Sequence, residues 1–171
     1  MKKIVSLFLI AASCAASASA LNFGASAGYL VDSEDVYFAA RGGLTLKATS
    51  AVIHSAELEV GYYEDSESGV TLSLMPVTLN YRAEFTNAGK FSPFVGAGAG
   101  MARVEAKGFS LKDSDTPFAV QAFAGVSYQA TETVSLNVAA RYIWVDDADL
   151  FGASGEVGDD VALEVGISFK F

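Results

Sequence analysis

Several features that stabilise proteins or bind nucleic acids are scarce in this 171-residue chain. It has one cysteine, Cys14, so no disulfide can form within the chain. Its 11 lysines and arginines face 20 aspartates and glutamates, an excess of negative charge that argues against nucleic acid as a partner. Beyond residue 20, no apolar run approaches the 18 or more residues of a transmembrane helix, so a helical membrane protein is excluded.

The first 20 residues have the pattern of an export signal. Lys2 and Lys3 precede the apolar stretch IVSLFLIAA, and ASA at 18–20 forms a cleavage site. We therefore expect residues 1–20 to be a signal peptide and residues 21–171 to be a single mature domain. Removal of the two lysines lowers the formal net charge from −9 to −11, and Cys14 is lost with them.

After residue 20 the sequence alternates between apolar and polar residues with a period of two, which is typical of β-strands. We expect eight strands, over residues 22–31, 36–47, 55–63, 70–85, 91–106, 117–129, 134–145 and 161–171. In the fourth strand the apolar parity changes near Met75-Pro76. We expect a β-bulge there, because proline cannot donate a hydrogen bond to the ladder.

The connections between these strands are alternately short and long. The long ones contain DSED, EDSESG, KGFSLKDSDT and DDADLFGASGEVGDD, and they hold 14 of the 20 acidic residues. An even number of strands with short turns at one end and longer loops at the other is typical of outer-membrane barrels. The predicted fold is all-β: an eight-stranded antiparallel up-and-down transmembrane β-barrel.

The position of the charges indicates which parity faces lipid. A soluble eight-stranded barrel also alternates, but it carries its charges outside. Here one parity of nearly every strand is apolar, and the small and charged residues of the other parity fit the narrow interior of eight strands better. The predicted lumenal charge network consists of Arg41, Glu57, Glu59, Arg82, Glu84, Arg103, Glu105, Arg141 and Glu164.

This predicted network holds four bases and five acids. Because an unpaired buried charge is costly, the near balance favours ion pairs and a sealed lumen. The expected pairs are Arg141 with Glu164, and Arg41 or Arg82 with Glu57 or Glu59. A narrow porin-like channel for small solutes or ions is the alternative.

Aromatic residues of the apolar parity gather near the two ends of the strands. Such a distribution predicts two belts at the membrane interfaces, where amphipathic rings lie at headgroup level. The belt at the loop end comprises Tyr29, Tyr62, Phe118, Tyr142 and Trp144, and the belt at the turn end comprises Phe23, Phe85, Phe91 and Tyr128.

Four segments in order resemble the small outer-membrane β-barrels of the opacity and OmpA-like type: SLMPVTLNYRAEF, FSPFVGAGAGMARV, AGVSYQATETVSLNVAARYIW and GISFKF. The resemblance implies a protein of the bacterial outer membrane with a structural or surface-interaction role and no common catalytic residues. It implies outer-membrane lipids and lipopolysaccharide as partners, with an unknown surface ligand possible. It further implies that Phe169 and Phe171 form a C-terminal insertion signal for the barrel-assembly machinery.

Other features carry little chemistry. The only histidine, His54, is expected in a solvated turn at the periplasmic end, so we expect no enzyme, and no cofactor is implied. The glycines at 96, 98 and 100 lack the fingerprint of a dinucleotide loop, and their face is uncertain. The acidic groups of DDAD and DSD are expected to be solvated, with Ca²⁺ binding as the alternative.

Overall fold

The computed structural model describes residues 20–171 except 68–69, 87–88 and 109–110, so most of the predicted signal peptide lies outside the described residues. No helix among the described residues is long and apolar enough to cross a membrane. The strands are β1 (Leu21–Leu30), β2 (Val36–Ala48), β3 (Val52–Glu67), β4 (Val70–Phe85), β5 (Phe91–Gly108), β6 (Leu111–Asp115), β7 (Phe118–Gln129), β8 (Val134–Val145), β9 (Ala148–Leu150), β10 (Ala153–Gly155) and β11 (Gly158–Lys170).

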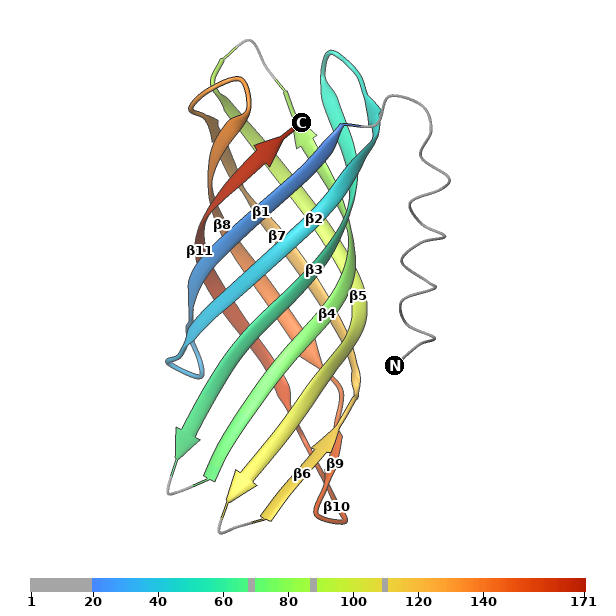
Figure 1. The fold of residues 1–171 in the computed structure, drawn as a ribbon, viewed down its shortest axis with the longest axis vertical. Coiled ribbons are helices and arrows are strands. Elements are labelled where there is room, and N and C mark those ends of the chain that lie inside the picture. The colour runs from blue at the N-terminus through green and yellow to red at the C-terminus, as the bar shows by residue number, and fades with distance from the viewer. Residues whose placement is uncertain (1–19, 68–69, 87–88, 109–110) are drawn as a thin grey trace.

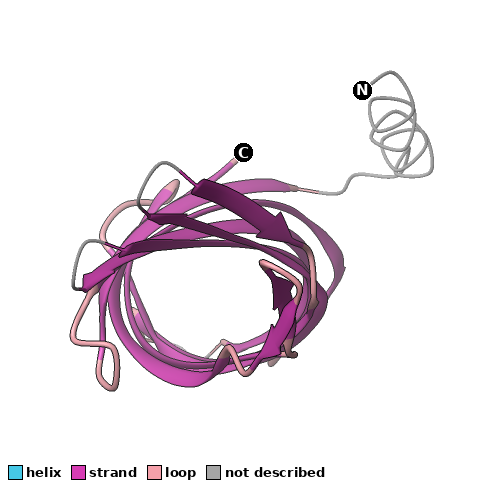
Figure 2. Cartoon of the chain, turned by 90° about the horizontal axis from the view of Figure 1, so that it is seen from below, coloured by secondary structure: helices cyan, strands magenta, loops and turns pink. Residues whose placement is uncertain are grey.

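The eight longest strands, β1, β2, β3, β4, β5, β7, β8 and β11, form a closed antiparallel barrel (Figures 1 and 2). Each pairs with its neighbours in this order, and β1 also pairs with β11, from Asn22 opposite Lys170 to Leu30 opposite Ala162. Closure satisfies the backbone groups of both edge strands, which lipid could not do. The predicted fold class is confirmed.

The two ends of the barrel differ in their connections (Figure 1). At the turn end, β2 joins β3 and β7 joins β8 through short turns, and Phe171 donates its backbone N–H to the carbonyl of Leu21. At the loop end, β6 extends the pairing of β5, and β9 and β10 form a hairpin between β8 and β11. The sequence predicted long acidic loops where these three short strands lie.

Side chains alternate between the outside and the inside of the barrel as the strand period requires. On β11, Leu163 and Val165 are 56% and 62% exposed, whereas Glu164 between them is 3% exposed. The same contrast recurs on β8, where Val138 is exposed and Asn137 is buried. An apolar exterior around a polar interior is the arrangement expected of a barrel in lipid.

The bulge predicted at Met75-Pro76 is wrong. β3 and β4 keep one register past this point, with Val60 opposite Val77 and Tyr63 opposite Leu74. The apolar parity changes because Leu74 points into the barrel, where the interior itself becomes apolar. The irregularity in the sheet lies instead on β2, between Thr45 and Lys47.

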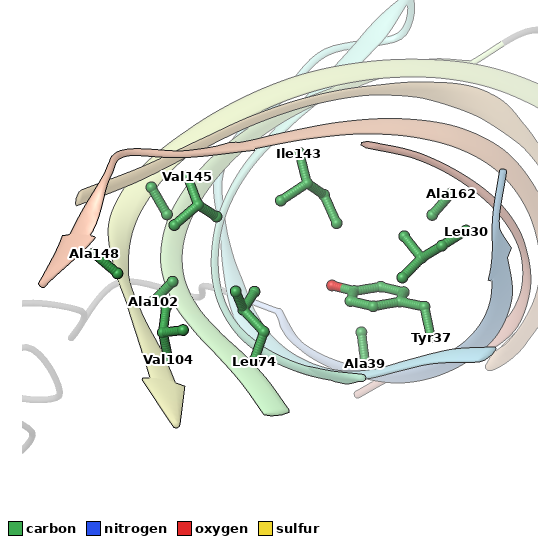
Figure 3. Close-up of a cluster of buried hydrophobic side chains, with 11 residues drawn as sticks. Leu30, Tyr37, Ala39, Leu74, Ala102, Val104, Ile143, Val145, Ala148 and Ala162 are labelled. Carbon is green, nitrogen blue, oxygen red and sulfur yellow. The ribbon is translucent and has the colours of Figure 1, made fainter. Parts of the chain in front are cut away.

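The interior near the loop end is filled by an apolar cluster, here called the apolar layer (Figure 3). Its members come from most of the barrel strands and from β9, and all are at most 7% exposed. They are Leu30, Tyr37, Ala39, Leu74, Ala102, Val104, Ala119, Ile143, Val145, Ala148 and Ala162.

Candidate functional site: the lumen and the loop end

The middle of the lumen is organised around Arg141 on β8. Its Nη1 lies 2.7 Å from Glu59 Oε1, and its Nε donates a hydrogen bond to Glu164 Oε1. Glu164 is on the neighbouring strand β11, but Glu59 is on β3, across the barrel. All three side chains are at most 3% exposed, so the bridge ties opposite walls together in a region that water hardly reaches.

Gln121 on β7 extends this bridge with neutral groups. Its Nε2 lies 3.0 Å from Glu59 Oε1, 2.8 Å from Thr78 Oγ1 and 2.7 Å from Asn80 Oδ1. The ring of Phe123 lies 4.9 Å from the Arg141 guanidinium. Glu59, Gln121, Arg141 and Glu164 form what is here called the central network, which joins β3, β7, β8 and β11.

A second group of charges lies between the central network and the turn end. Arg82 Nη2 donates to Glu84 Oε2 at 2.9 Å, and its guanidinium lies 3.8 Å from the centre of the Phe94 ring. Lys170 of β11 reaches Glu84 Oε1 at 3.0 Å. Glu84 therefore forms ion pairs with two cations, Arg82 of its own strand and Lys170 from across the barrel.

Little space is left around these charges. The cavity beside the central network, lined among others by Arg41, Glu57 and Phe94, has a volume of about 10 Å³. Such a volume holds about one water molecule. Toward the turn end the lumen widens to a cavity of about 180 Å³ lined by Arg82, Glu84 and Lys170 among others.

The structure brings together seven of the nine residues of the predicted lumenal charge network. Arg141 lies against Glu164, and Arg41 lies 4.0 Å from Glu59, but Arg82 is bonded to Glu84 rather than to Glu57 or Glu59. Missing from the prediction were Lys170 and the buried amides Asn80, Gln121 and Asn137. All of them have the inward parity of their strands, and this parity could have identified them from the sequence.

Arg103 and Glu105 do not belong to the lumen, so this part of the prediction is wrong. Odd-numbered residues of β5 face outward, as the exposure of Phe91, Val95 and Met101 shows. Arg103 is 53% exposed and contacts Glu105 at 3.4 Å on the outer face near the loop end. The strand passes beyond the apolar exterior there, so an outward charge meets no lipid interior.

The glycines of β5 face inward and make room for larger side chains. A Cβ atom at Gly96 would lie 2.3 Å from the Phe123 ring, and one at Gly98 would lie 1.8 Å from Asn80 Oδ1. The close approach of the aromatic and amide groups therefore depends on these two positions.

The predicted belt residues lie on the outer face near the two ends of the barrel. At the turn end Phe23 contacts Phe171 at 6.2 Å between ring centres, and Phe91 contacts Tyr128 at 5.0 Å. Phe171 is 75% exposed and Phe169 is 38% exposed. The remaining predicted belt residues are Phe85 at the turn end and Tyr29, Tyr62, Phe118, Tyr142 and Trp144 at the loop end.

Acidic side chains at the loop end fasten the backbone. Asp113 and Asp115 of β6 accept the backbone N–H groups of Phe151 and Asp149, which holds the β9–β10 hairpin. Asp160 accepts from the N–H and hydroxyl of Ser33. Within the described ranges, no three histidine, cysteine or acidic residues gather as a metal site would require.

His54 lies on β3 rather than in a turn, on the outer face near the turn end. Its Nδ1 is bonded to the hydroxyl of Tyr81 on the neighbouring strand. The expectation of a solvated turn histidine is therefore wrong.

The fold has relatives among solved structures, whereas no curated protein matches the chain. Neisserial surface protein A superposes with a TM-score of 0.72 at 16% identity, covering 91% of this chain and 98% of that chain. The N-terminal β-barrel domain of Pseudomonas aeruginosa OprF gives 0.60 at 19% identity, covering 89% and 97%. Ail, the attachment invasion locus protein of Yersinia pestis, gives 0.59 at 12% identity, covering 90% and 97%.

These identities indicate a shared fold and no more, but a family comparison goes further. The family described as the outer membrane protein beta-barrel domain matches residues 4–171, nearly the whole chain. The chain therefore belongs to this family, and its barrel is a barrel of the bacterial outer membrane.

Proposed function

We propose that the protein is a sealed barrel with a structural or surface-interaction role in the outer membrane. The observation that carries this proposal is the bridge from Glu59 through Arg141 to Glu164, beside which the lumen holds a cavity of only about 10 Å³. The apolar layer fills the same lumen nearer the loop end. An ion would have to break the central network and also lose its water in the apolar layer.

In this proposal the loop end faces the exterior and presents the acidic loops. Residues 1–20 act as a cleaved signal peptide, and the barrel-assembly machinery recognises Phe169 and Phe171 during insertion. Lipopolysaccharide and the other outer-membrane lipids surround the belts. The exposure of Phe171 and its contact with Phe23 support a place for its ring in the turn-end belt after insertion.

We also propose a non-enzymatic role. His54, the only histidine, is bonded to Tyr81 on the lipid-facing side of the barrel near the turn end. A substrate from outside the cell would lie at the loop end, away from this histidine.

A narrow channel is the second candidate, because the lumen widens toward the turn end. The cavity of about 180 Å³ there is lined by charged groups that could admit a hydrated ion as far as the central network. Conduction would then require Arg141 to exchange one carboxylate partner for another.

Planar-bilayer recording of the purified, folded protein separates the two candidates. We expect no stable unit conductance from the wild-type barrel, while a known porin in the same membrane shows that the assay detects one. Reproducible unit steps from the pure protein would overturn the sealed barrel and support the channel.

A further inference from the structure

A cluster of basic side chains lies on the outer face of the barrel near the loop end. Arg103, Lys107 and Lys112 surround Glu105, with nitrogen-to-carboxylate distances of 3.4, 2.7 and 3.0 Å. The three cations are 51% to 57% exposed, whereas Glu105 is 13% exposed. These four residues are here called the basic rim. Among the described residues of the loop end outside the lumen, all other charged side chains are acidic.

The basic rim faces sideways, toward the surroundings of the barrel. On β5 it continues the outward row of Met101, and Lys112 lies beside it on β6, opposite Lys107. Its neighbours on β4 are uncharged, since Arg103 is opposite Met75 and Glu105 is opposite Ser73. Glu64 of β3 is an acidic group on the same face, and it accepts a hydrogen bond from the hydroxyl of Tyr62.

The height of the basic rim matches the headgroup region of a membrane. Met101 lies opposite Phe118 of the loop-end belt, and Arg103, Glu105 and Lys107 follow it along the strand. An extended strand rises about 3.3 Å per residue, so these side chains lie within roughly 20 Å of the belt along a tilted strand. Belt aromatics mark the interface itself, so the cations project just beyond it.

The charge of the basic rim is fixed at neutral pH. Hydrogen bonds from Lys107 and Lys112 lower the pKa of Glu105 to about 2, so the carboxylate is ionised and holds both ammonium groups in place. Three cations around one anion leave a net positive charge. Each lysine ammonium has three N–H donors, and each contacts one oxygen of Glu105. Lys107 and Lys112 therefore keep further N–H donors for another anion.

We infer that the basic rim binds phosphate groups of a lipid in the outer leaflet, whose acyl chains lie along Met75, Met101 and Phe118. Clusters of lysine and arginine beside an apolar surface attract anionic lipids in this way. The inference rests on the proposed function in one respect, that the loop end faces the exterior. It does not depend on whether the lumen conducts, so conductance and lipid binding can fail independently.

Native mass spectrometry of the folded, full-length barrel in detergent tests the inference. The probes are lipid A with two phosphates, the same lipid A without phosphate, and inorganic phosphate. The variant is Lys107→Gln/Lys112→Gln. Its matched control is Lys47→Gln/Lys90→Gln, which removes the same number of positive charges at the turn end. Retention of the heat-modifiable gel band shows that each variant is folded.

We expect the wild-type barrel to retain phosphorylated lipid A and to retain the dephosphorylated lipid much less. Loss of about fivefold in affinity per charge predicts that Lys107→Gln/Lys112→Gln binds roughly 25-fold more weakly. The control pair should bind within about twofold of the wild type.

Three results would overturn the inference. Equal losses in both pairs would mean that general attraction, and not the basic rim, holds the lipid. Equal binding of the dephosphorylated lipid would exclude phosphate as the recognised group. Binding of inorganic phosphate as tight as that of the lipid would exclude the lipid as the ligand.

Discussion

The central network and the apolar layer fill neighbouring parts of one lumen by different physical means. In the central network, Glu59, Arg141 and Glu164 are buried as charges, and each depends on the others for compensation. In the apolar layer, side chains such as Leu74 and Ile143 are buried because they leave water, with no partner required.

This difference determines how each region contributes to the stability of the barrel. A buried ion pair recovers little more than the cost of removing its charges from water, whereas apolar burial is favourable for each side chain. We therefore expect the apolar layer to supply stability in small independent parts. The central network should behave as a unit that is lost completely when one member is removed.

Replacement of Arg141 tests that unit most strongly. Arg141→Ala leaves Glu59 and Glu164 buried without their common cation, and we expect it to lower the free energy of unfolding by about 3–5 kcal/mol. Urea titration followed by the heat-modifiable gel band measures the change.

The control for this prediction removes the charge from all three residues together. Arg141→Met/Glu59→Gln/Glu164→Gln should unfold much closer to the wild type than Arg141→Ala does, because no member of the bridge is left as a buried charge without its partner. Arg41 loses only a long contact, since it lies 4.0 Å from Glu59. If the triple variant were as unstable as Arg141→Ala, the loss would come from packing and the comparison would collapse.

Leu74→Ala tests the apolar layer. Leu74 is fully buried, so we expect a loss of about 2–4 kcal/mol from the lost transfer and the cavity left behind. The matched variant Leu79→Ala lies on the same strand but is 64% exposed on the outer face, where lipid fills the space. There we expect only the transfer cost, about 1–2 kcal/mol. Equal losses at the two sites in the same urea titration would contradict a packed interior at the loop end.

The smallest effect concerns the hairpin beside the apolar layer, whose Ala148 belongs to that layer. Asp115 accepts the N–H of Asp149, and this bond lowers the pKa of Asp115. Because the pKa is lowered, the bond stabilises the hairpin fully at pH values above the ordinary aspartate pKa of about 3.9. This stabilisation is lost as the pH falls through the lowered pKa of Asp115. Hydrogen exchange should show faster exchange of the Asp149 amide in Asp115→Ala at pH 5, because alanine has no side-chain acceptor. Protection in the wild type should decline only at lower pH. Unchanged exchange in the variant would show that Asp115 does not hold the hairpin.

Alternation in the sequence was enough to predict the barrel and most of its two faces. Glu164 lies between Leu163 and Val165, and a period of two leaves only one face for it once the neighbours meet lipid. The pairing of Arg141 with Glu164 followed because their strands are neighbours. The bridge to Glu59 could not follow, because a contact across the lumen depends on the stagger of the closed barrel.

The errors at the loop end share one physical cause, which is that the sorting of polar from apolar residues by lipid stops at the membrane surface. Arg103 and Glu105 lie past that surface, so their charge did not indicate their face. Leu74 lies inside although it is apolar, because the interior changes character near the same level. Lys170 was overlooked for another reason: it stands between Phe169 and Phe171 at the end of the strand, although its parity points inward.

The contacts of β11 also provide a test of strand alignment during assembly. Glu164 and Lys170 lie on its inward parity, where they meet Arg141 of β8 and Glu84 of β4. A slip of one residue against β1 would place both charges in lipid and turn Val165 and Phe169 into the lumen. A slip of one residue is therefore excluded by the parity of the strand, and a slip of two residues, which keeps the parity, would separate Glu164 from Arg141 and Lys170 from Glu84.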